Sequence, residues 1–303
     1  MRYSHWVMAL TLLSASTALS GCVGDAGGTM TPMTSSASAT PAGTPSGTPE
    51  AAADASPSAS ASAATRSYGS DPAQVYDVLQ PAAGAPAVTG TVVVVHGGFW
   101  HAEYDREHAR PEAAAFASAG YHVVLAEYRR AGMPGGGVPG TLDDVRDLLA
   151  SVAAQPDLPK PLVLVGHSAG GHLVAWAAGQ PWARERGIAG VVSLAGVVDL
   201  GAADRLHLGS DATRDFVGSG PGTAAWTSAD PMSTLPPKVP VRLVNGTDDD
   251  VVPPEVADAY VAKAKAAGAD VTEDLVQGAD HFAVITPDTP AFQRVLAAVH
   301  SLL

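Results

Sequence analysis

The chain has 303 residues, of which 46% are hydrophobic and 16% charged, and its formal net charge is −13 at pH 7. So acidic a chain is unsuited to bind nucleic acid or an anionic membrane surface through its folded part. The glycine-rich stretch 132–140 also lacks the Lys-Ser or Lys-Thr ending of a phosphate-binding loop. We therefore predict neither a nucleic-acid partner nor a nucleotide site.

The first 21 residues, 1–21, have the pattern of an export signal. Arg2 precedes an apolar stretch, residues 6–13, that is too short to span a bilayer, and the segment ends in Leu-Ser-Gly before Cys22. This ending resembles a bacterial lipobox, which implies cleavage before Cys22 and lipid on its sulfur. Cys22 is also the only cysteine of the chain, so it serves no internal disulfide. We expect an exported lipoprotein that Cys22 anchors at the extracytoplasmic face of the cell membrane, with plain secretion as the alternative.

Two further segments follow the signal peptide. Residues 22–67 consist mainly of Ser, Thr, Ala, Pro and Gly, with too few large apolar side chains to offset the entropy of folding, which predicts a disordered tether. Residues 68–303 are long enough for one catalytic domain with a large core. No sequence feature predicts an oligomeric state.

Strand-like and helix-like runs alternate along the domain. The expected strands are 91–95, 121–127, 161–165, 189–194, 241–245 and 271–276, and the expected helices are 141–153, 171–178, 254–267 and 290–303. Such alternation predicts an α/β fold with a doubly wound, mostly parallel sheet and helices on both faces. Residues 201–238 are rich in turn residues and predict a short helix within an irregular excursion, so the fold has a small lid or none.

Residues 166–170 read Gly-His-Ser-Ala-Gly, between the strand 161–165 and the helix 171–178. In this context a G-x-S-x-G motif forms a nucleophile elbow, a strained turn that presents the serine at the end of the sheet. Its neighbours must be small so that strand and helix can pack closely. We predict that Ser168 is the catalytic nucleophile.

A glycine-rich loop follows the β-branched strand 91–95. It reads His-Gly-Gly-Phe-Trp over residues 96–100, and bare glycines let the backbone approach a substrate carbonyl. We expect the N–H of Gly98 or Phe99, together with the N–H of Ala169, to form an oxyanion hole.

The base and the acid come later in the chain. A serine hydroxyl is a weak nucleophile at neutral pH, so an imidazole must take its proton and a carboxylate must orient that imidazole. His281 lies in the loop after strand 271–276, where the base is expected, and the contiguous aspartates 248–250 after strand 241–245 supply the acid. The order Ser, Asp, His is that of α/β-hydrolases rather than of chymotrypsin-like or subtilisin-like enzymes.

The other histidines near these motifs, at 96, 167 and 172, are expected to pack or to shape the pocket. His101 and His108 could only be metal ligands together with His96, and the chain has no second motif at zinc spacing. We therefore predict no metal and no cofactor.

Taken together, these motifs resemble the α/β-hydrolase superfamily over roughly residues 70–303. Within it the chain is most similar to the esterase group that includes kynurenine formamidase-like and hormone-sensitive-lipase-like carboxylesterases. The form H-G-G-x-W at 96–100, rather than H-G-G-G, points to the formamidase-like branch, and Glu-Tyr-Arg-Arg at 127–130 resembles a structural segment of these families. The family pattern G-x-x-D-x-x-V-P, laid on residues 246–253, implies that Asp249 is the acid.

Several side chains are candidates for the substrate pocket. Phe99, Trp100, Tyr104 and His167 lie in or beside the motifs, and Trp226 lies in the excursion 201–238. Surface or core packing is at least as plausible for Trp100, Tyr104 and Trp226. We predict a serine carboxylesterase that acts on small or medium-sized ester substrates. The alternatives are an amide-bond hydrolase with the same triad, either arylformamidase-like or a peptidase, and a non-catalytic binding lipoprotein.

Overall fold

The computed structural model describes residues 64–86 and 88–303. The predicted signal peptide, the anchor Cys22 and the predicted tether up to residue 63 lie outside these described residues. Among the described helices, none combines the length and the apolar character needed to cross a membrane.

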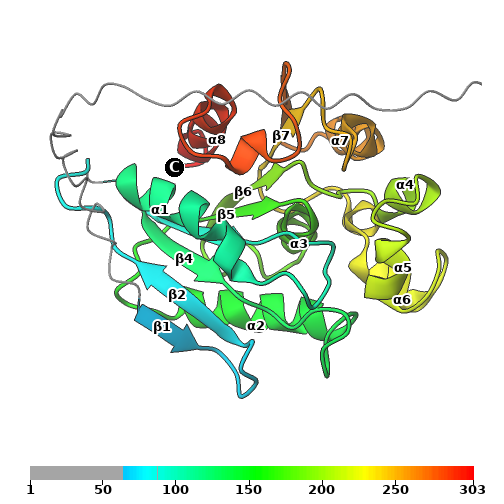
Figure 1. Ribbon diagram of the computed structural model, residues 1–303, viewed down its shortest axis with the longest axis horizontal. Helices are drawn as coiled ribbons and strands as arrows, with labels where there is room; N and C mark the ends of the chain where they lie inside the picture. Colours follow the sequence, from blue (N-terminus) through cyan, green and yellow to red (C-terminus); the bar gives the residue numbers. More distant parts are fainter. Residues whose placement is uncertain (1–63, 87) are drawn as a thin grey trace, which may run out of the picture. The chain divides into compact units, whose positions relative to one another are not determined.

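One eight-stranded sheet forms the centre of the domain (Figure 1), with the strand order β1-β2-β4-β3-β5-β6-β7-β8. Strands β3 to β8 are parallel, whereas β2 is antiparallel to both of its neighbours. The strands are β1 (Ala64–Ser67), β2 (Val75–Leu79), β3 (Thr91–Val95), β4 (His122–Ala126), β5 (Leu162–His167), β6 (Ile188–Leu194), β7 (Val241–Gly246) and β8 (Val271–Val276). The predicted doubly wound, mostly parallel sheet is confirmed.

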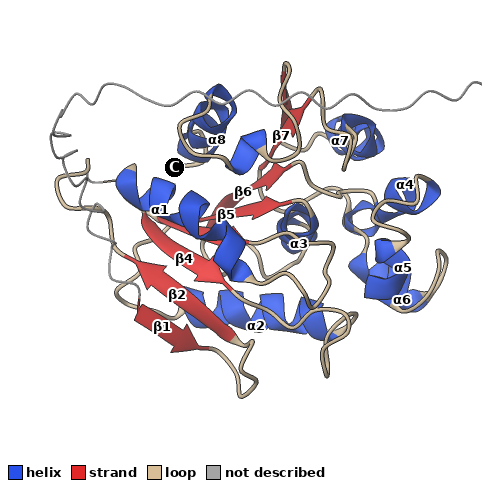
Figure 2. Cartoon of the chain, in the orientation of Figure 1, coloured by secondary structure: helices blue, strands red, loops and turns tan. Residues whose placement is uncertain are grey.

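Helices cover both faces of this sheet (Figure 2). The α-helices are α1 (Arg110–Ser118), α2 (Gly140–Ala153), α3 (Ala169–Ala178), α4 (Leu200–Arg205), α5 (Ala212–Val217), α6 (Ala224–Ala229), α7 (Asp258–Ala266) and α8 (Pro290–His300). Short 3-10 helices are η1 (Arg106–Ala109), η2 (Pro231–Thr234), η3 (Pro254–Val256) and η4 (Ala283–Ile285). Residues of α2, α3 and α7 share one apolar core, and residues of α1 and α8 share the other.

Strand β3 shows why its sequence is a continuous apolar run. Val93 and Val95 belong to the core under α2 and α3, while Val92 and Val94 belong to the core under α1 and α8. Successive side chains of a strand point to opposite faces, so a strand covered on both sides needs an apolar residue at every position.

The amino-terminal edge of the sheet differs from the prediction. Residues 64–67, which the prediction assigned to the tether, form β1, so the domain begins earlier than residue 68. Their sequence is polar, and tertiary contacts hold them: Arg66 pairs with Asp157, and the Thr65 hydroxyl donates to Asp77 at 2.6 Å. Such contacts leave no local pattern in the sequence.

Smaller differences concern helices. The sequence did not predict α1, and the expected helix 254–267 is divided into η3 and α7. The excursion 201–238 contains three short helices, α4 to α6, and η2 rather than one short helix. None of these changes the carboxyl edge of the parallel strands.

Candidate active site

The three predicted triad residues follow three parallel strands at their carboxyl ends. Ser168 follows β5, Asp249 follows β7 and His281 follows β8. The carboxyl ends of parallel strands meet at one edge of a sheet, where ligands bind in open α/β folds. The fold therefore gathers residues that are up to 113 positions apart in the chain, since 281 minus 168 is 113.

Ser168 has the strained backbone expected of an elbow. Its φ is 54° and its ψ is −116°, a conformation that costs a non-glycine residue about 1–3 kcal/mol. A Cβ at Gly170 would collide with the carbonyl oxygen of Val95, and a Cβ at Gly166 with that of Gly170. Only glycines at both positions let α3 begin so close to β3 and β5.

Asp249 and His281 form a buried hydrogen-bonded pair. The Nδ1 atom of His281 lies 2.8 Å from Oδ2 of Asp249, and the two residues are 4% and 5% exposed. The other oxygen of the carboxylate, Oδ1, accepts the backbone N–H groups of Val251 and Val252 at 3.0 and 2.8 Å. Because Asp249 Oδ2 requires a donor, the proton of neutral His281 lies on Nδ1, and Nε2 is free to accept one.

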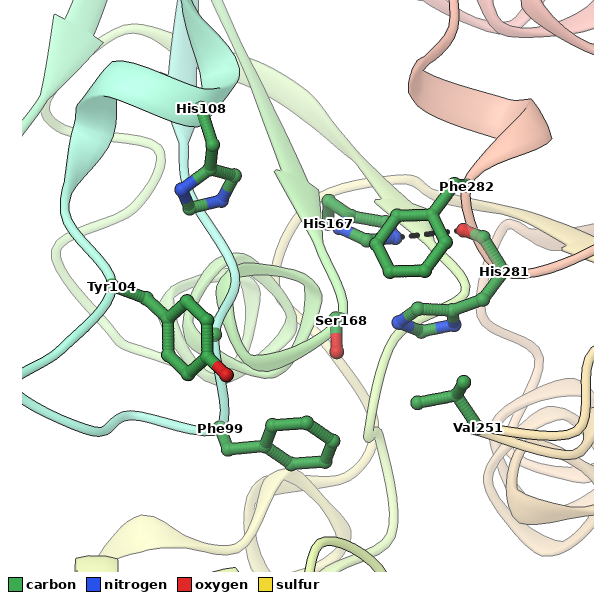
Figure 3. Close-up of a pocket in the computed structure, with 9 residues that line it drawn as sticks. Phe99, Tyr104, His108, His167, Ser168, Val251, His281 and Phe282 are labelled. Carbon is green, nitrogen blue, oxygen red and sulfur yellow. Dashed lines mark hydrogen bonds between the residues drawn. The ribbon is translucent and has the colours of Figure 1, made fainter.

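Figure 3 shows the Ser168 hydroxyl and the His281 ring facing each other across a cavity. Its volume is about 230 Å³, which suits a small substrate. The wall is mostly aromatic and apolar, and its residues are Gly98, Phe99, Tyr104, His108, His167, Ser168, Val251, His281 and Phe282.

Backbone N–H groups are available beside Ser168. Gly98 and Phe99 both have positive φ angles, 105° and 53°, and Ala169 is the first residue of α3. Within the described part of the chain, the N–H groups of Gly98, Phe99 and Ala169 donate to no protein acceptor. The first N–H groups of a helix lack intrahelical partners, which makes this place suited to an oxyanion.

A buried ionic cluster holds the loop that carries Gly98 and Phe99. The Tyr128 hydroxyl donates to the carbonyl oxygen of His96 at 2.8 Å, and Nε2 of His96 lies 3.1 Å from Oε1 of Glu127. Burial alone would raise the pKa of Glu127, but the hydrogen bond and charge of His96, the backbone N–H of Arg106 and the charge of Arg130 together lower the pKa to about 2. The ionised Glu127 thus fixes the start of the loop.

Comparison with known proteins identifies the family. The family model described as BD-FAE matches residues 76–263, well over half of the chain. The chain belongs to the BD-FAE family. This BD-FAE protein is also 30% identical, over 136 residues, to kynurenine formamidase of Danio rerio, a match that covers 44% of the chain and 45% of that relative.

Solved structures similar to this BD-FAE protein share its fold. An esterase from the Planctomycetes species Thermogutta terrifontis is 22% identical with a TM-score of 0.63, over 80% of this chain and 91% of that one. Esterase B from Lactobacillus rhamnosis is 21% identical with a TM-score of 0.65, over 79% and 85% of the two chains. A truncated carbohydrate esterase from gut microbiota is 19% identical with a TM-score of 0.67, over 81% and 98%.

The predicted pocket residues separate into two groups. Phe99, Tyr104 and His167 line the cavity, but Trp100 and Trp226 do not. Trp226 is buried in the core, so its prediction as a pocket residue was wrong. Trp100 is only 1% exposed; its Nε1–H donates to Nδ1 of His172 at 3.2 Å, and its ring stacks on Phe216. Its φ of 57° is close to the 53° of Phe99, so its packing partners rather than φ account for its place in the core. Its prediction as a pocket residue was wrong.

Three lining residues were not predicted as part of the pocket: His108, Val251 and Phe282. Val251 and Phe282 lie next to the acid and base motifs, so adjacency in sequence was the available signal for them. His108 comes from η1, and no local pattern connects it to the site. Within residues 64–86 and 88–303, no group of three or more His, Cys, Asp or Glu side chains is arranged to hold a metal ion.

Proposed function

We propose that this BD-FAE protein is a serine hydrolase that cleaves carboxylic ester bonds of small or medium-sized substrates. The observation that carries the proposal is the buried Asp249–His281 pair, bonded at 2.8 Å, beside a serine on a strained elbow. The solved structures of similar fold are described as esterases, which supports an ester as the bond cleaved.

The proposed mechanism uses an acyl-enzyme. Nε2 of His281 takes the proton of the Ser168 hydroxyl while the oxygen attacks the ester carbonyl. The N–H of Gly98 or Phe99, together with that of Ala169, stabilises the oxyanion that forms, and Asp249 stabilises the imidazolium. His281 then gives its proton to the leaving alcohol. A water molecule, activated by the same imidazole, releases the acid and restores Ser168.

A second candidate is hydrolysis of an amide bond by the same residues. The likeness to Danio rerio kynurenine formamidase favours a formamide, as does the His-Gly-Gly-Phe-Trp loop at 96–100. We also propose that the protein is exported and anchored through Cys22, with residues before the domain as a tether. A lipoprotein outside the cytoplasm would meet esters more readily than a cytosolic catabolite.

The test is a panel of p-nitrophenyl esters, aryl formamides and peptide anilides, with wild type and Ser168→Ala side by side. We expect ester turnover in wild type, a fall of several orders of magnitude in kcat for Ser168→Ala, and a covalent organophosphonate adduct on Ser168. The far-ultraviolet circular dichroism of the variant should match that of wild type. Equal ester turnover by both proteins, with contaminating esterase excluded, would refute the proposal.

A further inference from the structure

The acid and the base are tied to each other far more closely than to the nucleophile. The loop after β8 forms three hydrogen bonds with the loop after β7 besides the His281–Asp249 pair. One runs from Nε2 of Gln277 to the Thr247 hydroxyl at 3.2 Å. The N–H of Asp248 donates to the carbonyl oxygen of Ala279 at 3.0 Å, and the N–H of Gly278 donates to the Thr247 hydroxyl at 2.9 Å. Ser168 follows β5, and two strands, β6 and β7, separate β5 from β8. A further contact must therefore set the distance between the base, His281, and the nucleophile, Ser168.

One hydrogen bond crosses this gap. Nε2 of His167 lies 2.9 Å from the main-chain oxygen of His281, the contact drawn as a dashed line in Figure 3. Among the described residues, it is the only hydrogen bond between residues 166–172 and 277–283. The two rings also pack with their centroids 4.5 Å apart. His167 immediately precedes Ser168, so the bond joins the elbow directly to the base.

The chemistry of the two partners fixes the protonation of His167. A main-chain carbonyl oxygen only accepts, so Nε2 of His167 must carry the hydrogen. Burial, and then the charge of His281, lower the pKa of His167 to about 3. His167 is therefore a neutral donor, and it places no positive charge beside His281 when that ring becomes an imidazolium.

We propose that His167 is a positioning residue for the base: its Nε2–H holds the carbonyl of His281 and thereby sets the distance from the imidazole to Ser168. The inference rests on the proposed function, because it assigns roles to Ser168 and His281. A displacement of about 1 Å between reacting groups costs as much as 100-fold in rate. Loss of the bond should lower kcat rather than raise KM, since His167 acts on alignment in the transition state.

The experiment compares His167→Leu, which removes the donor, with His167→Gln, whose amide N–H can reach the same carbonyl. His172→Leu is the matched control, because His172 is also fully buried and its Nε2 lies 2.9 Å from a carbonyl oxygen, that of Ala229, away from the base. For the best ester substrate, we expect His167→Leu to lower kcat about 10- to 100-fold with KM within about twofold. His167→Gln should recover most of the loss. His172→Leu should lower Tm at least as much as His167→Leu. Because His172 also accepts from the Trp100 indole behind the loop at 96–100, its control readout is the Nδ1 proton of His281, which should keep its wild-type resonance.

Two nuclear magnetic resonance measurements test whether His167 positions His281 without requiring ester hydrolysis. In wild type, the ¹⁵N shifts of His167 should report a neutral ring protonated at Nε2 from pH 8 down to pH 5. The downfield proton on Nδ1 of His281 should shift or broaden in His167→Leu and return in His167→Gln. A His167 ring protonated at Nδ1, or equal kcat values in wild type and His167→Leu, would overturn the inference. If wild type neither turns over esters nor takes up the phosphonate, the proposed function fails, and the two resonances still show whether the bond positions His281.

Discussion

Replacing Asp249 by asparagine tests the triad sharply, because the structure dictates how the new side chain must lie. Oδ1 of Asp249 accepts two backbone N–H groups, those of Val251 and Val252. The amide oxygen of asparagine must take that place, since the opposite orientation would set an NH₂ group against two donors. Each unsatisfied buried donor costs about 1–3 kcal/mol, so the two together favour this orientation by roughly 2–6 kcal/mol.

The asparagine NH₂ group then faces Nδ1 of His281 in place of the Oδ2 acceptor. His281 can meet this donor only with a bare Nδ1, which moves its proton to Nε2, the atom that must take the proton of Ser168. Base catalysis is lost although the geometry survives. We expect kcat to fall about 10⁴-fold for Asp249→Asn, which corresponds to about 5 kcal/mol in the activation free energy.

The assay is steady-state hydrolysis of a p-nitrophenyl ester, with Asp248→Asn and Asp250→Asn as matched controls. Both flanking aspartates are exposed, so these variants change the same charge beside the same turn without touching His281. They should keep kcat within about threefold of wild type, as surface changes away from the reacting groups do. If Asp248→Asn or Asp250→Asn is the most damaging of the three, the acid has been assigned to the wrong residue.

Three further predictions concern stability and the amino terminus. Burial raises the pKa of Glu112 from 4.5 to about 8, so the folded state holds this proton where the unfolded chain releases it, and stability falls as pH rises from 4.5 to 8. In urea unfolding, the free energy of unfolding of Glu112→Gln minus that of wild type should be roughly 5 kcal/mol larger at pH 9 than at pH 4. A difference that does not change with pH would contradict the raised pKa of Glu112. Burial lowers the pKa of His172 from 6.5 to about 4, so wild type should lose stability as pH falls from 6.5 to 4. His172→Gln should lose less stability over this range. Parallel curves of unfolding free energy against pH for the two proteins would contradict this prediction. Cys22→Ser should abolish partitioning of the protein into the detergent phase, and partitioning of this variant would refute the proposed anchor. A chain beginning at residue 60 retains β1 and should hydrolyse esters without a membrane. Inactivity of this truncated chain, when folded, would refute that expectation.

Local chemistry explains which parts of this molecule the sequence predicts. A strand, a Gly-x-Ser-x-Gly turn and a helix are adjacent in the chain, so the place of Ser168 in the fold follows from a single short segment. The place of His281 follows from parallel topology, because residues after parallel strands share one edge. The choice of Asp249 among three contiguous aspartates required the family pattern; in the structure, it is the buried one of the three.

The direction of individual side chains could not be predicted in the same way. Trp100 follows Phe99 directly, yet one ring lines the cavity and the other lies in the core. The φ angles of the two residues are nearly equal, 53° and 57°, so the difference depends on the packing partners Phe216 and His172, which are distant in the chain. The same holds for β1, whose polar residues pair with β2 and with Asp157 through tertiary contacts.

The run of three left-handed residues, Gly98, Phe99 and Trp100, bears on how this enzyme could acquire new substrates during evolution. Two of the three are not glycine, and each holds an unfavourable conformation, at about 1–3 kcal/mol, in a loop that the buried indole supports from behind and the His96–Glu127 pair holds at its start. An insertion or deletion there would release the indole and lose the donors beside Ser168. Within residues 201–238, Phe216 shares this constraint because its ring stacks on the indole, and none of the residues that line the cavity comes from this excursion. Divergence in substrate choice should therefore accumulate at cavity residues outside the loop, such as Val251 and Phe282, while the loop at 96–100 keeps its length.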